Sequence, residues 1–195
     1  MIIWEGNFNV DSDTIESISS ELKTIPKAHF LDQGLYSSYR LSAEEGPNFI
    51  LNDFYGQVIE HVCKQLTTYE RSRYRWHFWL QVYEPGSSGH DIHDHWSGNE
   101  MFSWVHFLKP VNKSFHFLVE GQKVYPKRQN PGDFIVFPSW ALHAVDGNDT
   151  DDERVVIAGN VMMDALNVDY NNGHVKYTTC TTITKDVYVW NVVDR

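Results

Sequence analysis

Three histidines, two of them separated by a single residue, constrain the fold of this chain more than any other feature. His93 and His95 flank one aspartate, and His143 lies far downstream. A β-strand places residues i and i+2 on the same face, so the first two imidazoles are predicted to point to one side. His143 is predicted to come from a distant strand, and Arg154 from the strand after it. The spacing therefore predicts a β-rich fold in which distant segments supply one site.

Neutral imidazole is the commonest metal ligand in proteins. Three nitrogen ligands on one side of an ion leave positions open for a substrate and oxygen, as in mononuclear non-haem iron sites, although the usual triad contains one carboxylate. Asp91 and Asp94 therefore stay open as oxygen ligands in place of a histidine. Arg154 offers a fixed cation with bidentate geometry, which suits the carboxylate of a small acid. Its alternative is a surface salt bridge with the acidic run 149–153.

Length and charge narrow the class of protein. A chain of 195 residues can bury a substantial core in one domain. The 16 basic and 26 acidic residues give a net charge of −10, which disfavours nucleic acid and anionic membranes as partners. Cys63 and Cys180 make neither a disulfide framework nor a Cys-x-x-Cys zinc motif. Neither a signal peptide nor a membrane span is recognisable, so we expect a reducing, cytoplasmic setting.

Helical periodicity covers two early segments, and strand patterns cover the rest. The helices are predicted over 12–22 and about 46–69. From Tyr74 onward, short apolar runs alternate with turn residues, which is typical of strands. The predicted strands are 76–83, 103–108, 113–119, 134–137, 155–162, 177–183 and 187–192. This order favours an α+β, mainly β fold with an antiparallel barrel or double sheet, and we expect residues 1–195 to form a single domain.

Several short runs around these residues form a recognisable set. They are Tyr83-Glu-Pro-Gly86, His93-Asp-His95, Ser103-Trp-Val-His106-Phe, Phe137-Pro-Ser-Trp140-Ala-Leu-His143 and Arg154-Val-Val-Ile-Ala-Gly-Asn160. Together they resemble the 2-oxoglutarate/Fe(II)-dependent oxygenase family related to prolyl hydroxylases, over about residues 76–163. Two positions depart from the family pattern. His95 stands where a carboxylate is expected, and Val156 stands where a small hydroxyl residue is expected.

The resemblance implies a double-stranded β-helix of the jelly-roll or cupin-like kind, with the N-terminal helices packed on it. It implies Fe(II) held by His93, His95 and His143, and 2-oxoglutarate paired through its distal carboxylate with Arg154. Tyr83, ahead of Tyr125, is the candidate for a further hydroxyl contact, and Asn160 for a hydrogen bond to backbone or cosubstrate. The implied reaction hydroxylates an amino-acid side chain or a small molecule and yields succinate and carbon dioxide.

Two alternatives stay open beside this reading. One is a three-histidine cupin-type dioxygenase that uses no keto acid, and the other is a non-catalytic, metal-binding β-barrel protein. Arg154 distinguishes the 2-oxoglutarate-dependent oxygenase from the cupin-type dioxygenase, because a dioxygenase without keto acid has no need for a buried cation. Expected partners are a small-molecule or peptide substrate, with no nucleic acid and no membrane. The β-rich tail offers an edge for a homo-oligomer.

Overall fold

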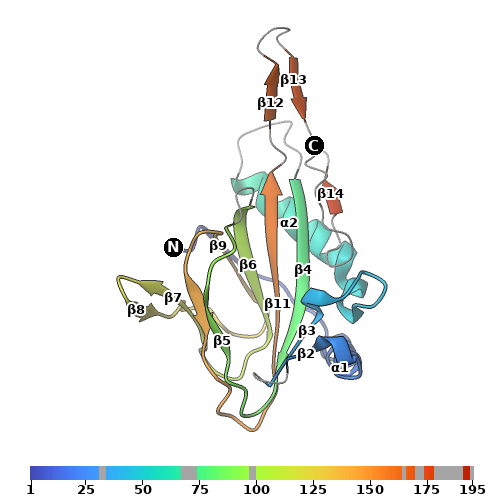
Figure 1. The fold of residues 1–195 in the computed structure, drawn as a ribbon, viewed down its shortest axis with the longest axis vertical. Helices are drawn as coiled ribbons and strands as arrows, with labels where there is room; N and C mark the ends of the chain where they lie inside the picture. Colours follow the sequence, from blue (N-terminus) through green and yellow to red (C-terminus); the bar gives the residue numbers. More distant parts are fainter. Residues whose placement is uncertain are drawn as a thin grey trace.

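The computed structural model describes residues 1–30, 34–66, 74–96, 100–163, 166–169, 174–177 and 191–193 (Figure 1). They form two facing sheets, a separate two-stranded sheet of residues 166–169 and 174–177, and two α-helices. The helices are α1 (Ser12–Lys23) and α2 (Asn52–Leu66). The strands are β1 (Trp4–Asn7), β2 (His29–Phe30), β3 (Leu35–Ser37), β4 (Tyr74–Tyr83), β5 (His90–His93), β6 (Glu100–Lys109), β7 (Phe115–Val119), β8 (Gln122–Val124), β9 (Asp133–Pro138), β10 (His143–Val145), β11 (Arg154–Met163), β12 (Leu166–Asp169), β13 (His174–Tyr177) and β14 (Asn191–Val193).

Both predicted helices are present. The carboxylate of Asp11 accepts a hydrogen bond of 2.8 Å from the Thr14 backbone N–H and so caps α1. Helix α2 continues a 3₁₀ turn at Pro47–Leu51, so the predicted segment 46–69 begins as a tighter helix. It ends at Leu66, and 67–69 lie outside the described residues. Each helix buries one apolar stripe, as its periodicity predicts.

The larger sheet carries the site on one face and the helices on the other. Its strands run in the order β1-β9-β6-β11-β4-β3-β2, with β14 also paired to β4. Successive side chains of a strand point to opposite faces of the sheet. All ten residues of β4 are buried, so both of its faces are covered. Its residues Trp76, Phe78, Leu80 and Val82 pack in the cluster that contains the helices, whereas Trp79 and Tyr83 belong to the cluster between the sheets.

The smaller sheet has the order β5-β10-β7-β8 and covers the face of the large sheet that the helices leave free (Figure 1). Phe115 and Phe117 of β7 pack against Phe137 of β9, with ring centroids 5.5 and 5.2 Å apart. These aromatic contacts hold the two sheets together. The predicted α+β, mainly β architecture with helices packed on a double sheet is confirmed.

Several short strands were not predicted from the sequence. Strand β1 precedes the first helix and pairs with β9, so the chain does not begin with helices as expected. Strands β2, β3 and β8 have two or three residues each, too few for a period to be recognised. In the tail, β13 overlaps the predicted strand 177–183 at one residue, and β14 overlaps the predicted strand 187–192 at two. Residues 178–190 lie outside the described residues. Neither described helix has the length and apolarity that a bilayer crossing requires.

One buried histidine of the helix-facing core gives the fold a measurable pH dependence. His106 is 2.8 Å from the Tyr55 hydroxyl and 2.9 Å from the Phe8 carbonyl oxygen, and burial lowers its pKa to about 4. An unfolded chain binds this proton near pH 6.5. Between these two values the unfolded state holds a proton that the folded state lacks, so stability falls as the pH falls from about 6.5 to 4, by roughly 3 kcal/mol.

We therefore expect His106→Asn to be less stable than wild type at pH 7 but less sensitive to acid. Urea unfolding of both proteins at pH 7 and pH 5 measures this. The stability that wild type loses between these pH values should exceed the loss in the variant by about 2 kcal/mol. Equal losses in the two proteins would show that His106 does not titrate differently on unfolding.

Candidate metal centre

Two hydrogen-bonded strands bring the three histidines together. Strand β5 pairs with β10 so that His93 lies opposite His143. The chain continues beyond β5, where the His95 backbone N–H donates to the Ser139 carbonyl oxygen at 2.8 Å. One nitrogen from each imidazole lies within 4.8 Å of the other two. The convergence predicted from the His-x-His spacing is therefore present.

Hydrogen bonds to carbonyl oxygens fix the tautomer of all three rings. Nδ1 of His93 is 2.7 Å from the Asp91 backbone oxygen, and Nδ1 of His143 is 2.8 Å from the Ala141 backbone oxygen. Nδ1 of His95 is 2.6 Å from Oδ1 of Asn160. A carbonyl oxygen can only accept, so each Nδ1 carries the proton and each Nε2 keeps its lone pair. Metal-binding histidines are typically held in this way.

Burial keeps two of the three imidazoles in the neutral form that binds a metal. It lowers the pKa of His95 to about 4, and it lowers the pKa of His143 to about 2, with the neighbouring histidines adding to the effect. Both rings are therefore neutral at neutral pH. The three ring centroids lie 4.3 to 5.2 Å apart, so two rings that burial keeps neutral share the site with His93.

The open question of an aspartate ligand has a geometric answer. Asp94 turns one carboxylate oxygen toward its own chain, where it accepts from the Trp96 backbone N–H at 3.1 Å. Asp91 is exposed, and its backbone oxygen holds His93. Within the described part of the chain, the group of side chains close enough to share one ion contains His93, His95 and His143 and no aspartate.

Asn160 connects His95 to the centre of the large sheet. Its Oδ1, which holds His95, also accepts from the Ser103 hydroxyl at 2.8 Å, and that hydroxyl lies 3.1 Å from the Ser139 hydroxyl. Ser103 and Asn160 are register partners on β6 and β11. The two serines were not singled out in the sequence. Their signal was a small polar residue within an otherwise apolar strand or motif.

This arrangement predicts that Asn160 tunes metal affinity without touching the metal. We expect Asn160→Ala to weaken Fe(II) binding about 10- to 100-fold, the usual effect of losing a partner of a ligating histidine. Ser103→Ala, which removes only a support of Asn160, should have a smaller effect. Competition with a chelating dye measures both. Wild-type affinity in Asn160→Ala would contradict the role of this hydrogen bond.

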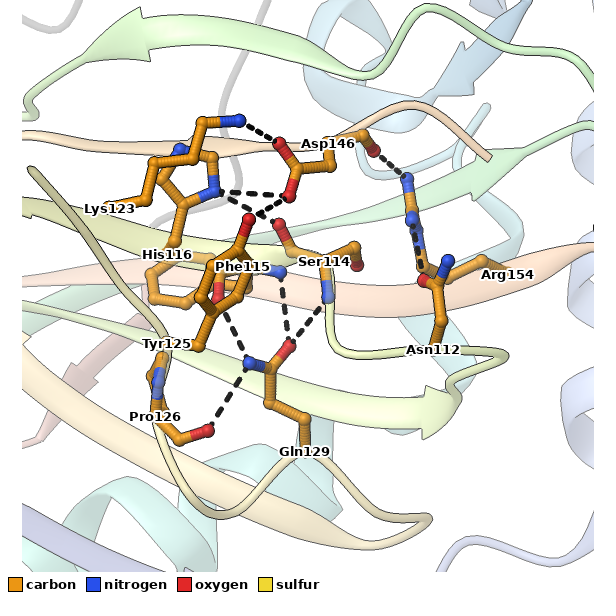
Figure 2. A network of polar contacts seen from close by, with 10 residues as sticks. All are labelled: Asn112, Ser114, Phe115, His116, Lys123, Tyr125, Pro126, Gln129, Asp146 and Arg154. Carbon is orange, nitrogen blue, oxygen red and sulfur yellow. Dashed lines mark hydrogen bonds and ion pairs between the residues drawn. The ribbon is translucent and has the colours of Figure 1, made fainter. Parts of the chain in front are cut away.

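Arg154 is the first residue of β11 and is 1% exposed. Figure 2 shows its guanidinium against two neutral acceptors: Nη2 donates to the Asp146 backbone oxygen at 2.9 Å, and Nη1 donates to Asn112 Oδ1 at 3.4 Å. The guanidinium carbon lies 4.3 Å from the centre of the Tyr83 ring. The alternative of a surface salt bridge with 149–153 does not hold, since no described carboxylate lies within ion-pair distance of Arg154.

A buried cation without a counter-charge is energetically costly. Desolvation lowers the pKa of Arg154, and its Nε has no hydrogen-bond partner among the described residues. Burial likewise raises the pKa of Tyr83, which keeps its hydroxyl protonated as a donor. This end of the site therefore offers donors and positive charge, and it suits an anionic ligand.

A cavity of about 740 Å³ between the two sheets joins the histidines to Arg154. The six residues predicted for the site all line it: His93, His95, His143, Arg154, Tyr83 and Asn160. Aromatic and aliphatic side chains form much of the remaining wall, among them Trp79, Phe107 and Phe115. A cavity that combines apolar walls with convergent polar groups suits a small molecule.

Tyr125, the second tyrosine considered for the cosubstrate, lies outside this cavity. Its hydroxyl donates to the Asp146 carboxylate, which also accepts from Lys123 at 2.6 Å and lies 3.6 Å from His116 (Figure 2). This network secures β8 against β10. His116 therefore belongs to this structural network and does not line the cavity. Asp146 nevertheless reaches the site, because its backbone oxygen holds Arg154.

No family model and no curated protein matches this sequence. Solved structures do resemble it. A prolyl-4-hydroxylase from Pseudomonas putida aligns with a TM-score of 0.56 and 13% identity, covering 82% of this chain and 91% of that one. A prolyl hydroxylase from Trichoplax adhaerens, in complex with a hypoxia inducible factor peptide fragment, aligns at 0.55 and 12%, covering 82% of each chain.

A third similar structure is HygX from Streptomyces hygroscopicus, with nickel, 2-oxoglutarate and hygromycin B bound. It aligns with a TM-score of 0.55 and 11% identity, covering 81% of each chain. The alignments span most of this chain and of each relative. At these identities the likeness concerns the fold, and it confirms the jelly-roll architecture that the sequence motifs implied.

Proposed function

We propose that this protein is an Fe(II)- and 2-oxoglutarate-dependent dioxygenase that hydroxylates an amino-acid side chain or a small molecule. One observation carries the proposal. Three imidazoles with free Nε2 atoms and a buried arginine without a carboxylate partner line the same cavity. A metal site alone does not require the arginine, and an anion site alone does not require the histidines.

The residues fit both absent groups. Imidazole nitrogen suits iron among the first-row metals, and the three rings are held in the tautomer that exposes Nε2. Three neutral ligands leave the double positive charge of Fe(II) uncompensated by the protein, and Arg154 adds a further cation. A keto acid with two carboxylates offsets much of this charge, and its distal carboxylate gives the orphaned Arg154 Nε an acceptor.

In this scheme His93, His95 and His143 hold Fe(II), and Arg154 holds the distal carboxylate of 2-oxoglutarate. Bound together, metal and keto acid supply oxidative decarboxylation by O₂, coupled to hydroxylation of a C–H bond in the substrate. Asn160 orients His95, and the ring of Tyr83 lies against the guanidinium of Arg154. The apolar walls keep water from the reacting groups.

The three-histidine set itself favours a second candidate, a cupin-type dioxygenase that needs no keto acid. A carboxylate ligand is absent from the described cluster, as such an enzyme would permit. The buried Arg154 separates the two candidates, because only the keto-acid scheme uses a cation at that position. A metal-binding protein without turnover is the third possibility and predicts no consumption of 2-oxoglutarate.

The substrate is proposed to be a peptide side chain or a small molecule. Similar folds bind either kind, a peptide in the Trichoplax structure and hygromycin B in HygX. We also propose a single oxygenase-like domain over residues 1–195 and, from the cysteine content, a reducing cytoplasmic setting. Self-association through the β-rich tail stays a prediction for sedimentation analysis.

Turnover tests the proposal directly. With Fe(II), O₂ and ascorbate, the protein should convert labelled 2-oxoglutarate to succinate slowly without a substrate, and faster when a peptide or small molecule that it hydroxylates is added. Oxygen uptake without succinate would support the keto-acid-independent dioxygenase. Absence of both across peptide and small-molecule libraries would support the metal-binding protein without turnover.

A further inference from the structure

Gln81 occupies a position between the two ends of the cavity. It lies on β4 opposite Val156, is 7% exposed and lines the cavity. One inward-facing neighbour along the strand is Tyr83, the register partner of Arg154. The other is Trp79, whose ring centroid is 5.6 Å from that of His95. A ligand that spans from Arg154 to the histidines therefore passes Gln81.

The side chain of Gln81 is held at one end and open at the other. Its Oε1 accepts from the Tyr83 hydroxyl at 3.3 Å. This contact occupies Oε1 and turns the amide nitrogen away from Tyr83, on a side chain that lines the cavity. An amide nitrogen carries two N–H donors. The nitrogen can therefore donate to a ligand bound in the cavity, where a hydrogen bond to a charged acceptor is stronger than one to a neutral acceptor.

The polar side chains near this amide are the donors Arg154 and Tyr83 and the hydroxyl of Ser37, the register partner of Gln81 on β3. Arg154 can only donate, and the Tyr83 hydroxyl is already used as a donor toward Gln81. Val156, directly across the strand pair, has no polar atom. Both groups contact Tyr83: the guanidinium lies over the face of its ring, and the amide lies at its hydroxyl. A carboxylate, which only accepts, fits between two such donors.

We infer that Gln81 donates a hydrogen bond, together with Arg154, to the distal carboxylate of the keto acid, and that Tyr83 acts by orienting the Gln81 amide. Gln81 is thus a specificity-determining residue for the cosubstrate, in place of the hydroxyl that Val156 lacks. The inference rests on the proposed function. It differs from the sequence expectation in placing an amide, rather than the Tyr83 hydroxyl, against the ligand.

The test uses two keto acids of equal length and measures binding rather than turnover. 2-Oxopentanoate carries a methyl group where 2-oxoglutarate has its distal carboxylate. Their Kd values for the anaerobic Fe(II) protein are obtained from the visible metal-to-ligand charge-transfer absorption. Gln81→Met should weaken 2-oxoglutarate binding about 10- to 100-fold, the effect of losing a hydrogen bond to a charged group. It should leave 2-oxopentanoate binding within about twofold.

Two further variants keep the test decisive if Gln81→Met folds poorly. Gln81→Glu places a like charge beside the carboxylate and should weaken 2-oxoglutarate more than Gln81→Met does. Tyr83→Phe removes the group that orients the amide but keeps the ring, so its effect should be smaller. Gln57→Met, at an exposed position of α2, is the matched control and should bind as wild type does.

The outcomes separate the inference from the function on which it rests. Absence of the charge-transfer band in wild type would overturn the proposed function and Gln81's role with it. A wild-type band with unchanged 2-oxoglutarate affinity in both Gln81 variants would leave the function standing and overturn the inference. Equal weakening of both keto acids would also overturn it, because that result indicates altered packing.

Discussion

Replacing His143 with alanine is expected to abolish Fe(II) binding at micromolar concentration, a loss of affinity of at least about 100-fold. Removing one of three ligands should cost more than removing a partner of a ligand, which typically costs 10- to 100-fold. His143 is 3% exposed and donates through Nδ1 to the Ala141 backbone oxygen, so it is preorganised for the metal. Equilibrium dialysis followed by iron analysis measures the effect.

The matched control is His61→Ala, which removes an exposed imidazole on α2, away from the cavity. It should keep wild-type iron binding, which shows that the loss belongs to the site and not to histidine content. Circular dichroism checks that His143→Ala keeps its sheets. A folded His143→Ala protein that binds iron as wild type does would show that the histidine cluster is not the metal site.

Arg154→Met is expected to weaken 2-oxoglutarate binding without changing Fe(II) binding. Affinity for 2-oxoglutarate should fall on the order of 100-fold or more, since truncating one partner of a buried charge pair costs about 2–5 kcal/mol. Fe(II) affinity should stay unchanged, because Arg154 touches none of the histidines. Without ligand, the variant should be no less stable thermally than wild type, because it removes a buried cation that no described carboxylate contacts within ion-pair distance.

Two controls make this result specific. Arg128→Met removes an exposed arginine, 3.4 Å from Glu5, and should leave 2-oxoglutarate binding unaffected. Arg154→Lys keeps the charge but loses the planar fork, so its affinity should fall between wild type and Arg154→Met. Equal affinity of wild type and Arg154→Met for 2-oxoglutarate would show that Arg154 does not bind the distal carboxylate.

The main elements of the fold were predictable because their patterns are long and regular. Strand β4 has ten residues and alternates between helix-facing and cavity-facing side chains. Strand β11 is equally long and apolar. Strand β1 was not predictable, because it has four residues and only Trp4 among them is a large apolar residue, although their burial alternates in the structure. Its pairing with β9 is a long-range contact that local sequence does not encode.

The site was predictable where local geometry dictated it. The i, i+2 spacing places His93 and His95 together, and the Phe-Pro-Ser-Trp motif leads into His143. The partners of these side chains depend on tertiary register and were not predictable. Asn160 of the larger sheet meets His95 in the segment that follows β5 of the smaller sheet, and Gln81 meets Tyr83 because both face the cavity.

If one cavity binds Fe(II) and 2-oxoglutarate together, anaerobic titration monitored by visible absorption should show it. We expect a weak charge-transfer band that requires protein, Fe(II) and 2-oxoglutarate, and that is lost in His143→Ala and strongly weakened in Arg154→Met. Iron binding without a band would contradict the keto-acid role of Arg154. Absence of iron binding would contradict the assignment of His93, His95 and His143 as ligands.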